Sequence, residues 1–161
     1  MEVKTKTGIS GHVKIYSLPP DFTYEDFKKL DDKNKYLVNE GDNLVVDTGI
    51  QQLLLLAIGS NTNSFTLCGV GTGTTAPVAT DTALGTSLGT NTINSRYRMG
   101  NTVYFETFFG KNDEAGTWAE TCILTAGSVM LCRKLISPTF AKSTSNAAVI
   151  SWQITGTATA D

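Results

Sequence analysis

The chain has 161 residues, of which 40% are hydrophobic and only 17% charged, and its formal net charge is −2 at pH 7. This length suits one domain that buries its own hydrophobic core without a metal or a disulfide. The slightly acidic balance argues against a nucleic-acid-binding protein, which normally carries a basic stripe. The longest apolar run, Leu53 to Ile58, is too short to cross a membrane.

The cysteines and the N-terminal end indicate where the chain folds. Cys68, Cys122 and Cys132 are odd in number and have no metal-binding spacing, so we expect three reduced, mostly buried thiols. The polar end at Met1 lacks the apolar stretch of a signal peptide. These features predict synthesis and folding in a reducing cytoplasm.

The first elements in chain order are a strand and a short helix. Residues 9–18 alternate between apolar and polar side chains, which predicts a strand that stops at Pro19. Thr23, with Asp26 three residues later, predicts the start of a short helix. The stretch "YLVNEGDNLVV" then predicts two short strands about a turn at residues 40–43. We assign residues 1–42 to an N-terminal strand, arm and short helix, a candidate attachment region, and residues 43–161 to the main domain.

An amphipathic helix is predicted at about residues 48–58, capped by Asp47 or Thr48 and ended by Gly59. Its apolar stripe should face the core and has the spacing i, i+3, i+4, i+7 and i+8. The residues of this stripe are Ile50, Leu53, Leu54, Ala57 and Ile58.

The rest of the chain is predicted to be β. Strands are expected at residues 64–71, 91–99, 102–110, 116–124, 129–137 and 147–156, with hairpin turns at Gly100–Asn101 and Ala126–Gly127. We therefore predict a mainly β fold, an antiparallel β-sandwich of jelly-roll-like type with the 48–58 helix packed against it.

The second hairpin carries a charged pair. A two-residue loop at Ala126–Gly127 would place Glu120 opposite Arg133 inside an apolar hairpin. We interpret them as a structural charged pair with charge-assisted hydrogen bonds. The alternative, a catalytic carboxylate, is less favoured because no second acid or base is recognisable nearby.

The stretch "CGVGTGTTAPVATDTALGT" raises the question of a phosphate-binding loop. Such a loop needs glycines that lead into a helix, and the Walker type also needs a lysine. No lysine occurs from Cys68 to Gly110. We therefore predict a structural glycine bend at Gly69, Gly71 and Gly73, whose spacing lets another segment pack closely on one strand face.

No enzymatic site is recognisable, so we predict a non-enzymatic protein without a catalytic residue, cofactor or metal. His12 is the single histidine, so a histidine-based metal site has no second histidine, and C-x-x-C does not occur. Phe105, Trp118 and Trp152 are predicted as core aromatics. A carbohydrate-binding module would instead expose two or three of Tyr97, Tyr104, Trp118 and Trp152 together, whereas a cement protein would bury them.

Five stretches resemble virion structural proteins of tailed bacteriophages: "NLVVDTGIQQLLLLAIG", "GVGTGTTAPVATDTALGT", "GNTVYFETFFG", "GTWAETCILTAGSVMLCRKLISPTFAK" and "ISWQITG". The similarity covers residues 43–156, and its most specific part is the GTGTTAP and DTALG segment. It implies that Glu120 and Arg133 are the charged pair of the second hairpin and that Trp152 is the aromatic of the last strand. The chain departs from the family pattern at "ETCIL", where a small residue and an aromatic are more usual.

The resemblance implies a non-enzymatic protein located in the virion. A capsid decoration or cement protein bound to the major capsid protein is the first expectation. A tail, collar or fibre component and a carbohydrate-binding host-recognition module are the alternatives. Sheet edges rich in Thr and Asn, with little charge, favour burial in a homo-oligomer, for which we favour a trimer. No nucleic acid or membrane partner is expected.

Overall fold

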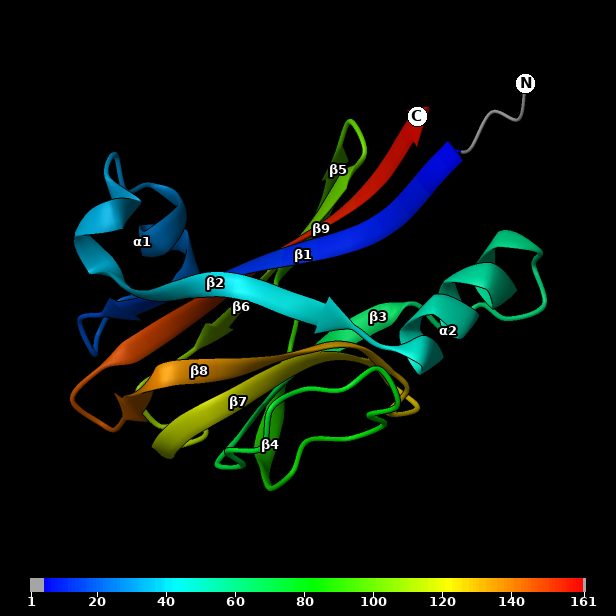
Figure 1. Cartoon of the computed structure of the whole chain (residues 1–161). Coiled ribbons are helices and arrows are strands. Elements are labelled where there is room, and N and C mark those ends of the chain that lie inside the picture. The colour runs from blue at the N-terminus through cyan, green and yellow to red at the C-terminus, as the bar shows by residue number, and fades with distance from the viewer. Residues whose placement is uncertain (1–4, 161) are drawn as a thin grey trace.

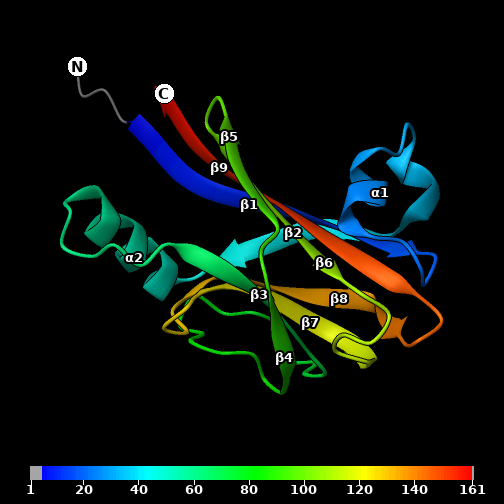
Figure 2. The ribbon, with the colours of Figure 1, turned by 180° about the vertical axis from the view of Figure 1, so that it is seen from behind.

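The computed structural model describes residues 5–160 and is mainly β, with nine antiparallel strands in one curled, half-barrel sheet (Figure 1). The strands are β1 (Thr5–Leu18), β2 (Leu37–Val45), β3 (Phe65–Gly71), β4 (Ser87–Thr92), β5 (Ser95–Met99), β6 (Thr102–Phe109), β7 (Gly116–Thr125), β8 (Met130–Lys142) and β9 (Ala147–Ala160). Two α-helices, α1 (Tyr24–Lys28) and α2 (Asp47–Ala57), and one 3-10 helix (Lys33–Tyr36) complete it. The two α-helices lie at opposite ends of the molecule (Figure 2).

The two ends of the sheet meet at one corner. The strand order is β4-β3-β7-β8-β2-β1-β9-β6-β5, so the edge strands β4 and β5 are consecutive in the chain. Only Ile93 and Asn94 separate them, and their N–H groups donate to Thr66 O at 2.9 Å and Glu106 O at 2.8 Å. The segment predicted as one strand at residues 91–99 is therefore divided between the edge strands β4 and β5. Because only two residues connect these strands, the two edges of the sheet stay close together and the sheet is curled.

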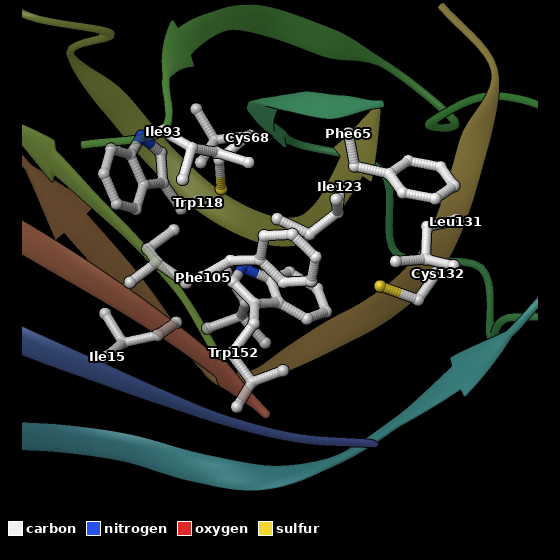
Figure 3. Packing of buried hydrophobic residues seen from close by; sticks show 14 of the residues in the cluster. Ile15, Phe65, Cys68, Ile93, Phe105, Trp118, Ile123, Leu131, Cys132 and Trp152 are labelled. Carbon is white, nitrogen blue, oxygen red and sulfur yellow. The ribbon is translucent and has the colours of Figure 1, made fainter. Parts of the chain in front are cut away.

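Strand β2 joins two half-sheets. Residues 37–43 pair with β1, whereas Leu44 and Val45 pair with β8. The half-sheets face one another across a common core, which includes Trp118 from one side and Phe105 and Trp152 from the other (Figure 3). The expected mainly β architecture is present, but a jelly roll or a sandwich of two separate sheets is not confirmed.

The N-terminal part differs from the sequence prediction. The expected turn at residues 40–43 lies inside β2, where Gly41 pairs with Val13, because β1 offers a continuous partner that outweighs the local turn signal. Strand β1 lies between β2 and β9 and pairs with β9 from Thr5 to Leu18. The boundary at residue 42 therefore does not separate two bodies within residues 5–160.

The short helix α1 is capped as predicted. The Thr23 side chain accepts from Asp26 N–H, and the Asp26 carboxylate accepts from Thr23 N–H at 2.8 Å, which is a reciprocal capping box. Phe27 of this helix packs into a second apolar cluster with Tyr16 and Val149. No helix in the described part of the chain is long and apolar enough to span a membrane.

Helix α2 forms at nearly the predicted residues but presents a different face to the sheet. Its N-cap is Val46, which makes no side-chain cap, so the expected cap by Asp47 or Thr48 is wrong. The residues that pack inward are Gly49, Gln52, Leu53 and Leu56. This set is rotated by one position, about 100°, from the predicted stripe, which leaves the following residues exposed: Ile50, Leu54, Ala57 and Ile58.

Two contacts set this rotation. Gly49 lies so close to the backbone of β8 that an added Cβ would be 2.6 Å from Leu131 Cα. The Gln52 side chain donates from Nε2 to Asn63 O at 2.7 Å. The contact of Gly49 with β8 requires a residue without a side chain. Hydrophobic periodicity could therefore not reveal which face of the helix packs on the sheet.

Replacing Gly49 by alanine tests this packing through the sign of its effect. Helix propensity alone predicts a stabilisation of about 1 kcal/mol, whereas overpacking against Leu131 costs about 1–3 kcal/mol. We expect Gly49→Ala to lower the free energy of unfolding, as measured by urea denaturation. Gly8→Ala, where nothing lies within 4 Å of the added Cβ, is the control. A more stable Gly49→Ala variant would contradict the assigned helix face.

Candidate functional site

The glycine-rich stretch becomes a long loop that covers the outside of the sheet. Residues 72–86 connect β3 to β4 without a strand or a helix and run along β7 (Figure 1). Glu120 and Cys122 of β7 point toward this loop, whereas Thr121 and Ile123 point to the opposite face, because side chains alternate along a strand. The loop thus forms an outer layer over the face of the sheet that points away from the main core.

Glu120 is the anion at the centre of this layer. It is fully buried, and its Oε1 accepts hydrogen bonds from Gly73 N–H at 2.9 Å and Thr86 N–H at 2.8 Å. Its Oε2 accepts from Gly85 N–H at 2.9 Å. One carboxylate therefore satisfies three backbone donors from both ends of the loop.

Arg133 of β8 completes the site. Its Nε and Nη2 donate to Glu120 Oε2 at 3.0 and 2.7 Å, and Nη2 also donates to Thr75 O at 2.9 Å. Its Nη1 donates to Asp81 Oδ2 at 2.7 Å, and the same oxygen accepts from Val78 N–H. The guanidinium thus joins the sheet carboxylate to the middle of the loop.

These contacts hold both carboxyl groups in the charged form. Burial by itself raises the pKa of Glu120, but the N–H groups of Thr86 and Gly85, with Arg133, outweigh it and lower the pKa overall. Burial also opposes the charge on Asp81, yet the Val78 N–H and Arg133 leave its pKa lowered. The two carboxylates in turn raise the pKa of Arg133 against the effect of burial.

The three predicted glycines are needed for close approach. A Cβ on Gly71 would lie 2.7 Å from Glu120 Oε1, and one on Gly73 would lie 2.8 Å from the Glu120 carboxyl carbon. A Cβ on Gly69 would lie 2.8 Å from Cys122 Sγ. The bend therefore leaves room for β7 side chains under the loop.

The register of the second hairpin differs from the prediction although its charged pair forms. Ser128 has a φ of 65° and lengthens the loop, and the register shifts at a bulge between Ile123 and Leu124, before the loop. Glu120 therefore pairs with Leu135, and Arg133 with Cys122. The shift is an even number of residues, so Glu120 and Arg133 still share a face as diagonal neighbours.

The site has the geometry to bind an anion, but the anion that occupies it is the carboxylate of Glu120. Successive N–H groups of a glycine-rich loop form the kind of concavity that binds phosphate, and here that concavity is filled by Glu120. A fully buried carboxylate with five hydrogen bonds has no contact with solvent through which to reach a substrate. These hydrogen bonds and ion pairs hold the 72–86 loop on the sheet, and we call them the internal tie.

The remaining predicted residues lie in the core. Phe105, Trp118 and Trp152 are buried there (Figure 3). Tyr97 is 42% exposed, but its ring stacks on Tyr104 with centroids 4.8 Å apart. Of the four aromatics considered for a sugar platform, the two tryptophans are therefore buried, and Tyr97 and the half-buried Tyr104 form a stacked pair.

Cys68, Cys122 and Cys132 are buried free thiols in the structure. Burial raises the pKa of each, to about 11 for Cys68. No cluster of His, Cys, Asp and Glu suited to a metal ion occurs within residues 5–160.

The sequence reasoning missed Asp81 and the backbone donors of Gly85 and Thr86. One signal was present, since Asp81 is the single charged residue from residue 72 to residue 86. A lone charge in an uncharged segment indicates a specific partner, but only the folded sheet identifies that partner as Arg133. Comparisons with protein-family models, curated proteins and solved structures found no match to this chain.

Removing the charge of Glu120 should strongly destabilise the protein. Glu120→Gln leaves Arg133 buried without its main partner, and we expect a loss of about 3–5 kcal/mol in the free energy of unfolding. Adding Arg133→Leu should recover part of this loss, and a double-mutant cycle measures the coupling. Glu25→Gln, in the exposed Lys28–Glu25 pair, is the control that should barely change the melting temperature. An equal loss of stability in the Glu120→Gln and Glu25→Gln variants would contradict a stabilising role of the internal tie.

The same site predicts acid sensitivity. Glu120 and Asp81 have lower pKa values in the folded protein than their ordinary values of 4.5 and 3.8, so unfolding in acid takes up protons. The stabilising contribution of the two carboxylates is therefore fully present above about pH 5.5. The free energy of unfolding decreases as the pH falls through 4.5 and 3.8. Urea denaturation between about pH 3.5 and pH 7 should show this fall in the wild type and a shallower one in Glu120→Gln. Parallel curves would contradict the lowered pKa of Glu120.

Proposed function

We propose that this protein is a non-enzymatic structural protein of a tailed-bacteriophage particle, a decoration protein that binds the assembled head through the major capsid protein and forms a homo-oligomer, with a trimer favoured. The resemblance of residues 43–156 to such proteins is one support. The jelly-roll-like sandwich predicted from the strand pattern is part of the same proposal, and its support is the core shared by two half-sheets.

The observation that carries the proposal is the apolar surface of α2. Leu54 is 62% exposed and Ile58 is 75% exposed, and Ile50 and Leu55 beside them are also exposed. Contiguous apolar surface of this kind marks an interaction site in a protein that otherwise buries its core well. We call these four residues the α2 apolar face.

A second copy of the chain is the occupant that this face suits. The helix carries one charged residue, Asp47, in its first turn, so copies can meet without like charges at the contact. A hollow of about 520 Å³ lies next to it, between Ile50 and the protruding end of β1 at Ile9. The surface beside the helix is therefore concave, and a second copy of the chain can place side chains in this hollow.

The mechanism of a decoration protein is thermodynamic. A protein that binds only the assembled shell stabilises the shell by mass action, and several linked copies increase the effective affinity. The internal tie between Glu120 and the loop serves this role by keeping the outer surface rigid. No reaction chemistry is required.

The location within the particle is tested by copy number. Gel densitometry of purified particles should give a copy number comparable with that of the capsid protein. Such a high copy number fits a head or a tail-tube protein, whereas a copy number far below it would mean a collar, fibre or tail-tip component.

Placing a charge on the α2 apolar face should separate the copies. The wild type should have about three times the 17.2 kDa mass of one chain, and Leu54→Glu should have the mass of a single chain, because burying a carboxylate in an apolar contact is unfavourable. Light scattering coupled to gel filtration measures both masses. Val38→Glu alters another exposed aliphatic residue, 46% exposed on β2, and should leave the oligomer intact. A monomeric wild type would contradict the proposed contact.

A further inference from the structure

A small apolar pocket lies in the interior of the curled sheet, at the end nearest α2. Its volume is about 210 Å³, and Ser64 and Arg96 supply its polar groups. The apolar walls come from α2, β3, β6, β8 and β9, and their residues are Leu53, Phe65, Val103, Phe105, Leu131 and Ile154. The mouths of β-barrels are a common place for ligand pockets.

The walls of this pocket are firm. Phe65, Phe105 and Leu131 are buried members of the main core, and Phe65 and Leu131 lie at one end of that core in Figure 3. Close-packed core side chains do not readily collapse into a void. The space is therefore a feature of the fold rather than of mobile surface side chains.

Arg96 holds a positive charge at the pocket. It pairs with Phe105 across β5 and β6, so the two side chains lie on the same face of the sheet, and Arg96 is exposed at the edge of the pocket. Its Nη1 donates to Ser64 Oγ at 3.0 Å and Phe65 O at 3.3 Å, which fixes the guanidinium beside the apolar walls. No carboxylate within residues 5–160 forms a salt bridge with Arg96. Arg133, by contrast, has two carboxylate partners.

We propose that this pocket binds a short-chain aliphatic carboxylate, with the hydrocarbon among the apolar walls and the carboxylate on Arg96. The remaining guanidinium N–H groups suit a carboxylate, because Arg binds such groups through two parallel hydrogen bonds. At about 30 Å³ for each water-sized group, the volume holds roughly seven methylene-sized groups. The inference goes beyond the proposed function and does not depend on it.

A chain-length series tests the size of the site. Butanoate, hexanoate, octanoate and decanoate are titrated into the full chain, and the methyl NMR signals of Leu53, Val103 and Ile154 are followed. The dissociation constant should fall about fourfold for each added methylene, which corresponds to about 0.8 kcal/mol, and level off near octanoate. Shifts that do not saturate, or equally large shifts at Leu54 and Ile58, would overturn the proposal by showing adsorption on the α2 apolar face.

Two variants test the chemistry. Arg96→Gln should weaken octanoate binding about tenfold and leave octanol binding unchanged, whereas Arg98→Gln should change neither, because Arg98 Nη1 donates to Gly100 O instead. Val103→Phe should abolish binding by filling the pocket. Unchanged octanoate affinity in Arg96→Gln would overturn the proposed carboxylate contact. The oligomer mass should be the same in the Arg96 variant and the wild type, so failure here is distinguishable from failure of the proposed assembly.

Discussion

The carboxylate of Glu120 accepts hydrogen bonds from three backbone N–H groups of the 72–86 loop and from two N–H groups of Arg133. The rest of the outer layer depends on this set of contacts, because a 15-residue segment without regular structure otherwise leaves its backbone groups to water. Asp81 extends the same network from the middle of the loop. A buried ion pair of this kind is a modest source of net stability, but it specifies one position for the loop, since any other position leaves a buried charge unpaired.

The curled sheet separates the interior of the protein from the surfaces available to partners. Strand β2 pairs with β1 along most of its length and with β8 at its end, so two half-sheets enclose one core. The crossing at Ile93 and Asn94 ties the opposite edge strands to their neighbours. Beyond this crossing, β4 and β5 each pair with a single strand, so both edge strands present one side that has no partner strand within residues 5–160.

The proposed functions follow from two surfaces with opposite chemistry. The α2 apolar face is exposed and uncharged, which suits contact between copies of the chain. The pocket has apolar walls and the exposed guanidinium of Arg96 at its edge, which forms no salt bridge within residues 5–160 and suits a small anionic ligand. Leu53 lines the pocket from the inner side of the same helix whose outer side presents Leu54. A ligand there and a neighbouring copy would therefore contact opposite sides of α2.

The sequence by itself determined what depends on local periodicity and on the chemistry of single residues. Alternation indicated most strands, Thr23 and Asp26 indicated the capped helix, and the absence of lysine near the glycines argued against a nucleotide loop. Tertiary structure decided the rest. The face that α2 buries depends on the contact of Gly49 with β8, and the hairpin register depends on a bulge, neither of which hydrophobicity encodes. Three of the donors to Glu120 are backbone N–H groups far away in the chain, and because every residue type except proline carries the same N–H group, only the fold could select them.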